Sequence, residues 1–66
     1  MDTKELGRFI KNKRLEKHIS QNELANMLHV SRAAVSKWET GINIPGLFNL
    51  KELSKILEFN LSELSN

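Results

Sequence analysis

Cysteine is absent from this 66-residue chain, and proline occurs once. Without cysteine the chain has no disulfide, no thiolate nucleophile and no thiolate-ligated zinc site. No apolar run exceeds three residues, far short of the roughly 20 that span a membrane, and the N-terminus lacks a basic head followed by an apolar block. These absences favour a reducing compartment, and we expect the protein in the cytoplasm.

The composition is that of a compact fold, with 39% hydrophobic and 27% charged residues. A chain this short buries only about 60% of the surface that it exposes when unfolded. We therefore expect a single domain over residues 1–66 with modest stability, which oligomerisation would raise. The net charge is +2, and the positive excess falls within residues 1–45. Such a distribution is compatible with a polyanionic partner, although many soluble domains are as basic.

Helical spacing of apolar residues predicts the first two helices. Leu6, Phe9 and Ile10 follow the i, i+3, i+4 pattern within residues 3–17, and Thr3 is available as the N-cap. Ser20 and Glu23 have the spacing of a capping box, in which each side chain bonds the backbone N–H of the other residue. A second helix therefore begins there and continues to Leu28.

The remaining chain predicts two further helices and a short terminal one. Ser31 is a suitable N-cap for a helix over residues 31–40, and Gly41 can adopt the left-handed conformation that ends it. Residues 42–46 form an exposed connector, leucines at helical spacing follow from Leu47 to Leu57, and Asn60 with Glu63 forms another capping box. With no strand pattern, the fold class is all-α: four helices plus a short terminal helix, with helices two and three forming a helix-turn-helix.

Residues 21–39 contain two amphipathic segments separated by a tight break. In the second segment one side carries Val35 and Trp38, and the opposite side carries Arg32, Ala33, Ser36 and Lys37. The tryptophan side chain is suited to stacking on a base, but its spacing from Val35 favours the core. The predicted core comprises Leu6, Ile10, Leu24, Leu28, Val30, Val35, Trp38, Leu50, Leu53 and Leu57, with the small Ala25 where two helices cross.

His18 and His29 each stand where one helix must stop before the next begins. Such sites favour positive φ, which His adopts more readily than most non-Gly residues. We interpret both as helix C-cap residues. A metal or acid–base pair is the alternative, but no carboxylate or third ligand stands at a recognisable spacing. A phosphate contact by a protonated ring is a further alternative.

The stretch SQNELANMLHVSRAAVSKWETG, followed by Pro45 and the spacing of Leu50, Leu53 and Leu57, resembles the Cro/C1-type helix-turn-helix DNA-binding proteins. The resemblance covers residues 6–64. It departs from the family pattern at His18 and His29, where Gly is common. The resemblance implies a lambda-repressor-like fold whose third helix enters the major groove of double-stranded DNA.

The resemblance also implies roles for individual residues. Arg32, near the start of the third helix, is the leading candidate for reading a guanine, because a guanidinium can bond its O6 and N7 together. Ala33, Ser36 and Lys37 are further base-contact candidates, the last two also within reach of phosphate. The candidates for phosphate contact are Ser20, Gln21, Ser31, Thr40 and Asn43. A solvated helix face is the ordinary alternative for Arg32 and Lys37, and we favour it for Arg8 and Lys11.

Arg14 and Glu39 are expected to form a structural ion pair. Glu39 lies near the C-terminus of the third helix, where the helix dipole disfavours an anion, so a nearby cation would relieve it. The resemblance implies that this cation is Arg14, in a partly buried pair that fixes the first helix against the third. We assign neither residue to DNA contact.

We predict a sequence-specific double-stranded DNA binder that regulates transcription, expected to act as a repressor and as a homodimer on a two-fold operator. Phe48, Ile56 and Leu61 are the candidates for a self-association patch. Two alternatives are the antitoxin of a toxin–antitoxin pair and the DNA-binding half of a longer repressor. An enzyme is the least favoured class, because no catalytic cluster or phosphate loop can be assembled, and we predict no cofactor and no metal.

Overall fold

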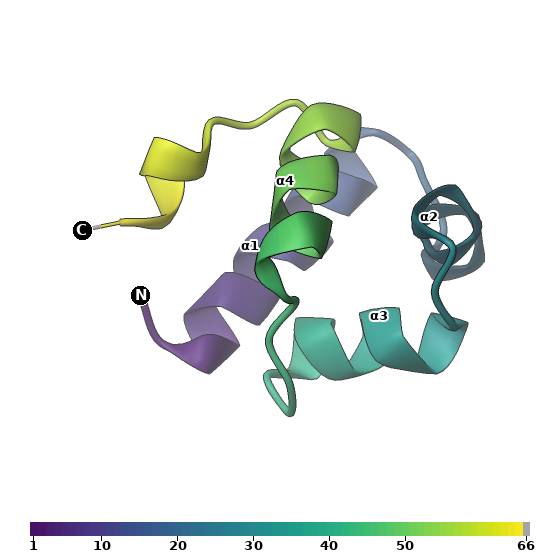
Figure 1. Cartoon of the computed structure of the whole chain (residues 1–66), viewed down its shortest axis with the longest axis horizontal. Helices are drawn as coiled ribbons and strands as arrows, with labels where there is room; N and C mark the ends of the chain where they lie inside the picture. The colour runs from purple at the N-terminus through teal and green to yellow at the C-terminus, as the bar shows by residue number, and fades with distance from the viewer. Residues whose placement is uncertain (66) are drawn as a thin grey trace.

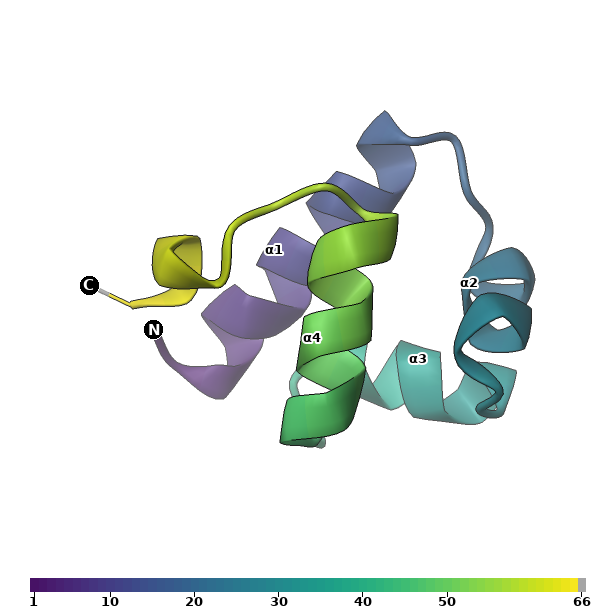
Figure 2. The same cartoon turned by 45° about the horizontal axis from the view of Figure 1, so that its top comes forward.

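The computed structural model describes residues 1–65. This part of the chain forms four α-helices and a short 3₁₀ helix: α1 (Thr3–Glu16), α2 (Gln21–Leu28), α3 (Arg32–Thr40), α4 (Leu47–Ile56) and η1 (Leu61–Leu64). Helix α3 packs against both α1 and α2, and α4 covers the space that these three helices enclose (Figures 1 and 2). The all-α prediction is confirmed. Among the described residues no helix is long and apolar enough to span a membrane.

Side chains cap the N-termini of α1, α2, α3 and η1, whereas α4 begins after Gly46 without a side-chain cap. The predicted capping boxes at Ser20 and Asn60 are both present. The predicted cap at Thr3 is wrong, because Asp2 caps α1 instead and Thr3 is the first residue of the helix. The Asp2 carboxylate accepts the Glu5 N–H at 2.7 Å, and the Glu5 carboxylate accepts the Asp2 N–H at 3.3 Å. An Asp-x-x-Glu box therefore does what Thr3 was expected to do.

All four α-helices end in the same way, with one residue in the left-handed conformation followed by an apolar residue. The left-handed residues are His18, His29, Gly41 and Glu58, with φ of 56°, 58°, 80° and 58°. The N–H of each following residue donates to the carbonyl five residues earlier: Ile19 to Arg14, Val30 to Ala25, Ile42 to Lys37 and Phe59 to Ser54, at 2.9–3.2 Å. This is the Schellman arrangement, which satisfies the last carbonyls of a helix.

Both histidines have the positive φ predicted for them and exposed side chains, and His29 is the C-cap of α2 as predicted. His18 is one residue past the C-cap of α1, which is Lys17. Glu58 was not predicted to adopt this conformation. Its carboxylate is held by Lys17 Nζ at 2.6 Å, which ties the end of α4 to the end of α1. Hydrogen bonding from that ammonium lowers the pKa of Glu58 below its usual value.

The core lies between the four helices. Its buried apolar side chains are Ile10, Leu24, Ala25, Leu28, Val35, Trp38, Leu53, Leu57 and Phe59. Leu6, Val30 and Leu50, also predicted for the core, are half-buried against it. Phe59 was missed. Its ring meets the Phe9 ring edge to face, with centroids 5.0 Å apart, and so attaches the segment after α4 to α1.

Candidate nucleic-acid interface

Helix α3 lies at the edge of the molecule with one face in the core and the other uncovered. Val35, Trp38 and Glu39 are buried beneath it. Arg32, Ala33 and Lys37 are exposed on the other side, and Ser36 is half-buried. The tryptophan is therefore a core residue, as its spacing predicted, and its ring is not available to stack on a base. The structure groups the four predicted base-contact residues on one face of one helix.

Local interactions fix both ends of α3. The Ser31 hydroxyl oxygen accepts the Ala34 N–H at 3.1 Å, which caps the first turn. At the other end the Gly41 and Ile42 amides donate to the Trp38 and Lys37 carbonyls. The Thr40 hydroxyl also donates, to the Ser36 carbonyl at 3.0 Å. The helix thus has defined ends beside the connector to α4.

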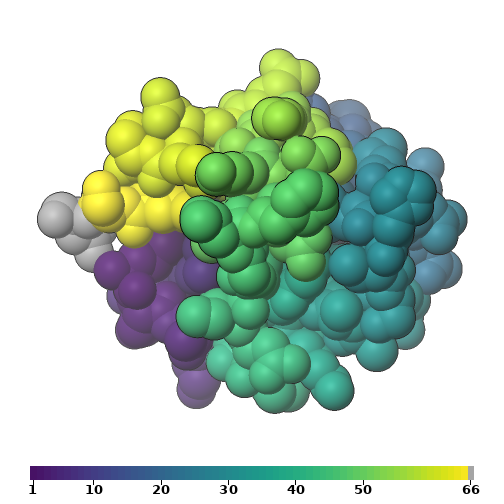
Figure 3. All heavy atoms as spheres, in the orientation of Figure 1, coloured from purple at the N-terminus to yellow at the C-terminus, as the bar shows by residue number. Residues whose placement is uncertain are grey.

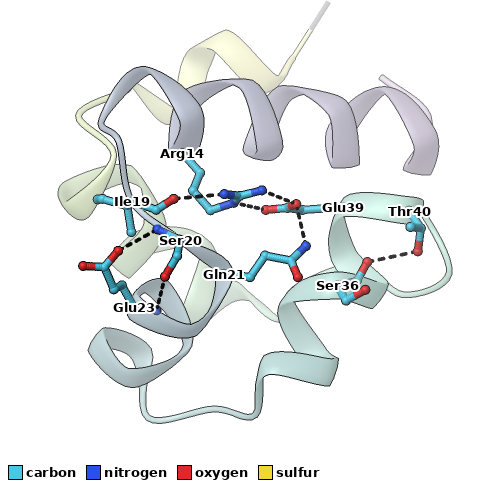
Figure 4. Close-up of polar contacts among 8 residues, drawn as sticks. All are labelled: Arg14, Ile19, Ser20, Gln21, Glu23, Ser36, Glu39 and Thr40. Carbon is cyan, nitrogen blue, oxygen red and sulfur yellow. Dashed lines mark hydrogen bonds and ion pairs between the residues drawn. The ribbon is translucent and has the colours of Figure 1, made fainter.

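A buried ion pair joins α1 to α3. Arg14 Nε lies 2.6 Å from Glu39 Oε2, and Arg14 Nη2 lies 2.9 Å from Glu39 Oε1 (Figure 4). Both residues are 93% buried, and the two-pronged geometry matches a guanidinium to a carboxylate. Hydrogen bonding to the carboxylate raises the pKa of Arg14 above its ordinary value. Arg14 is accordingly a fixed positive partner for Glu39.

The same pair also holds the start of α2. Arg14 Nη1 donates to the Ile19 carbonyl at 2.9 Å, just before α2 begins. Gln21 Nε2 donates to Glu39 Oε1 at 2.9 Å, so this oxygen accepts from α1 and α2 together (Figure 4). No buried side-chain nitrogen or oxygen of residues 1–65 is left without a partner. This network sets the position of α3 relative to the other two helices.

The network also determines the charge of the uncovered face. The sequence of α3 contains two cations, Arg32 and Lys37, and one acid, Glu39. Since Glu39 is buried against Arg14, the exposed side of α3 presents both cations without an acid from its own helix. Over residues 1–65 neither cation takes part in an ion pair. The face is positive and has unsatisfied donors.

The five predicted phosphate-contact residues lie at the ends of α2 and α3. Ser20 and Ser31 are N-caps whose hydroxyl oxygens accept backbone N–H groups, which leaves each O–H proton free to donate elsewhere. Asn43 is exposed in the connector after α3. Thr40 differs, because its O–H proton already goes to the helix backbone. Its hydroxyl must rotate before it can donate to a phosphate.

Gln21 has a role that the sequence did not reveal. It is half-buried, and one of its amide protons bonds Glu39. A carboxamide has two protons and a carbonyl oxygen, so one N–H remains for another partner. No spacing rule links residue 21 to residue 39, because the contact depends on how α2 crosses α3. Among residues 1–65, Gln21 is the one predicted contact residue whose side chain hydrogen-bonds the Arg14–Glu39 pair.

Comparison with known proteins gives consistent matches. A family model described as helix-turn-helix matches residues 10–64. The chain is 43% identical over 51 residues to the HTH-type transcriptional activator BcrR of Enterococcus faecalis, a match covering 77% of this chain and 25% of that protein. It is 38% identical over 64 residues to the ImmF control region 10 kDa protein of Bacillus phage phi105, covering 97% of this chain and 71% of that protein. The chain thus spans a quarter of the first relative and most of the second.

Proposed function

The chain belongs to the Cro/C1-type helix-turn-helix family, and from this premise we propose that it binds double-stranded DNA sequence-specifically and regulates transcription. The observation that carries the proposal is the uncovered face of α3, where Arg32 and Lys37 are exposed and the helix's acid is turned into the core. A polyanion is attracted to such a face, and a helix about 10–12 Å across fits a major groove about 12 Å wide. We also propose that it acts in the cytoplasm.

In the proposed complex α3 lies in the major groove. Arg32, in its first turn, bonds a guanine through O6 and N7, and the Ala33 methyl contacts a thymine methyl. Ser36 and Lys37, one turn later, reach a base or the adjoining phosphate. These assignments follow the family resemblance, and the exposure of Arg32, Ala33 and Lys37 on α3 supports them. Arg14 and Glu39 bind no DNA and instead hold the helix that does.

The phosphate backbone is contacted from the ends of the two helices. Ser20 and Ser31 donate through their free O–H protons, and Gln21 donates through its remaining amide proton. Asn43 and, after rotation of its hydroxyl, Thr40 contact the backbone beyond the other end of α3. These contacts set the register of α3 in the groove and carry little sequence information.

Two copies bind one operator in this proposal. A two-fold pair of domains of this kind contacts half-sites about 34–36 Å apart, one turn of the double helix. Occupation of such a site by a small protein blocks competing proteins, so repression is the regulatory outcome that we propose.

Selection of bound duplexes from a random library tests the proposal. Wild-type protein should enrich one two-fold sequence. Arg32→Ala should relax the preference at one base position, by about 1–3 kcal/mol. Lys37→Ala should do the same at a neighbouring position if it reads a base. If it contacts phosphate, binding to all sequences should weaken alike and the salt slope should fall by about 1.

The matched control is Lys55→Ala. Lys55 is exposed on α4 and pairs with Glu52 at 3.4 Å, so its removal subtracts the same charge away from the proposed interface. It should change neither sequence preference nor salt slope. Recovery of no preferred sequence by the wild-type protein would refute the proposal, and equal loss at every sequence for Arg32→Ala would reassign that residue to the backbone.

A further inference from the structure

The C-terminal end of α3 is poor in positive charge. Residues 40–50, which follow Glu39 and include the whole connector to α4, contain no charged side chain. The two proposed backbone contacts in this segment, Thr40 and Asn43, are neutral, whereas phosphate affinity comes mainly from cations. The C-terminus of a helix also carries a partial negative charge, which repels a phosphate. A phosphate at this end of α3 therefore needs a cation from another element.

Lys4 of α1 lies directly against this end. A Cβ atom built on Gly41, the C-cap of α3, would fall 2.9 Å from Lys4 Cγ and 3.1 Å from Lys4 Cα. The backbone and the first part of the side chain of Lys4 therefore cross the Gly41 backbone. In Figure 3 the N-terminal part of α1 and the segment after α3 adjoin at the lower left of the molecule. Lys4 is thus a cation of α1 that the fold holds at the end of α3.

The charge of Lys4 is not neutralised within the fold. Three other cations of residues 3–17 have carboxylate partners: Lys13 with Glu16, Arg14 with Glu39 and Lys17 with Glu58. Lys4 is exposed and takes part in no ion pair within residues 1–65. Its neighbours Asp2 and Glu5 are acidic, but each of their carboxylates accepts the other residue's backbone N–H in the capping box of α1. The Lys4 ammonium is therefore free to bind an anion from outside the chain.

We propose that Lys4 binds a phosphate of the DNA backbone beside the C-terminal end of α3, as a contact residue contributed by α1. This inference rests on the proposed function and adds a residue to its interface. Lys4 supplies the positive charge that residues 40–50 lack, and it offsets the negative end of the α3 dipole where the backbone passes. The flexible stem of a lysine can lie along Gly41 while the ammonium reaches into solvent, where a phosphate is accessible.

The side of α1 on which Lys4 stands supports this assignment. Helix α1 meets α3 through Gly7 and Arg14. Lys4 precedes Gly7 by three residues, so the two are neighbours on one side of the helix. The other side of α1 carries Phe9, which packs against Phe59 after α4. Lys4 therefore stands on the side of α1 that borders the proposed interface.

Lys11 provides a matched control on the same helix. It precedes Arg14 by three residues, as Lys4 precedes Gly7, and it is exposed without an ion-pair partner in residues 1–65. Seven residues, or about 10 Å along the helix, separate it from Lys4 and from the contact with Gly41. An effect of general charge should be equal at both positions, whereas a local phosphate contact should be confined to Lys4.

The first test measures the salt dependence of binding to the selected operator duplex. Lys4→Met removes the charge and keeps most of the stem against Gly41. It should weaken binding to every sequence alike. The ratio of its Kd to that of wild type should fall about threefold between 50 and 200 mM salt for each bound copy, the change expected for one lost phosphate contact. Lys4→Arg should bind as wild type does, and Lys11→Met should keep the wild-type slope.

The second test places the contact on the DNA. Single phosphates of the operator are replaced in turn by uncharged methylphosphonates, and each duplex is bound by wild type, Lys4→Met and Lys11→Met. One replacement in each half-site should weaken wild-type binding and leave the binding of Lys4→Met unchanged, because both changes remove the same contact. Lys11→Met should respond to that replacement as wild type does. A purely structural role for Lys4 would weaken binding equally with and without the replacement.

Three results would overturn the inference. A wild-type salt slope for Lys4→Met would mean that the Lys4 ammonium touches no phosphate. An equal change for Lys11→Met would mean that α1 acts through its overall charge. The absence of any methylphosphonate position whose effect disappears in Lys4→Met would exclude a direct contact. A wild-type protein that binds no duplex would refute the proposed function as well, whereas any of the three results with a wild type that binds its operator would refute the Lys4 contact alone.

Discussion

Gly7 of α1 lies directly against the Trp38 carbonyl of α3. A Cβ atom built on Gly7 would fall 2.5 Å from that oxygen and 2.6 Å from the Glu39 carbonyl oxygen, closer than non-bonded atoms can approach. Both obstructing atoms are backbone, so neither can swing aside. The missing side chain at position 7 is therefore what allows α1 to approach α3 closely enough for Arg14 to reach Glu39.

Gly7→Ala should lower the free energy of unfolding by about 1–3 kcal/mol, the cost of overpacking a tight interface. Ala has the higher helix propensity, by about 1 kcal/mol, but the contact with fixed backbone should outweigh that gain. Urea denaturation measures the difference. Gly46→Ser is the control, because a side chain there meets open space and a serine N-cap is slightly favourable. A Gly7→Ala variant as stable as wild type would show that α1 shifts without cost.

Sequence patterns predicted the helices because each has a local signal. Ser20 and Glu23 mark the start of α2 through a capping box, and Gly41 marks the end of α3 through its conformational freedom. Gly7 and Phe59 escaped prediction for the opposite reason. Each matters only through a residue distant in sequence, Trp38 for the first and Phe9 for the second.

In the candidate site, too, features with a local sequence signal were predicted and most contacts between distant residues were not. The outward face of α3 could be predicted from helical periodicity, because Val35 and Trp38 fix which side is buried. The partnership of Arg14 and Glu39 came from family resemblance, since 25 residues separate the two. The bond from Gln21 to Glu39 could not be anticipated, because it depends on the crossing of α2 over α3.

Arg14→Ala should reduce stability by about 3–5 kcal/mol, because it leaves the Glu39 carboxylate buried without its cation. Thermal denaturation should show a lower Tm. DNA binding should fall only in proportion to the unfolded fraction, so at a temperature where the variant is folded its sequence preference should match that of the wild type.

The double variant Arg14→Met with Glu39→Leu provides the control, because it removes both charges and keeps most of the side-chain volume. It should recover much of the lost stability. Gln21 then loses its acceptor, so recovery should be incomplete. Unchanged thermal denaturation of Arg14→Ala would contradict a structural role for the pair.

His29→Gly should stabilise the protein, by up to about 1 kcal/mol. A non-Gly residue in the left-handed region costs roughly 1–2 kcal/mol, and Gly avoids this cost. The greater conformational freedom of Gly in the unfolded chain offsets part of the stability gained. The His29 side chain is exposed at φ of 58°, so little contact is lost. Asn26→Gly, exposed within α2 at ordinary helical angles, should instead destabilise. Urea midpoints that move the same way for both variants would argue against conformational strain at position 29.

Lowering the pH should reduce the stability of the protein, because it protonates Glu23 at the start of α2. The Ser20 backbone N–H donates to the carboxylate and lowers the pKa of Glu23 below its usual 4.5. A carboxyl whose pKa is lower in the folded protein contributes stability above the unfolded pKa and loses it as the pH falls through the folded pKa. Stability should therefore decline below about pH 4.5, with Asp2 and Glu58 adding to the decline since their pKa values are also lowered.

Glu23→Gln isolates this contribution, because glutamine still accepts the Ser20 N–H in a capping box but has no carboxyl to titrate. Its Tm measured from pH 6 to pH 2 should fall less steeply than that of the wild type, with the two curves converging at the acid end. Asn22→Gln changes the exposed neighbouring residue without removing a carboxyl and should follow the wild-type curve. If Glu23→Gln kept the full wild-type slope, the carboxylate at the start of α2 would not be linked to folding, and the acid sensitivity would have to come from Asp2 and Glu58.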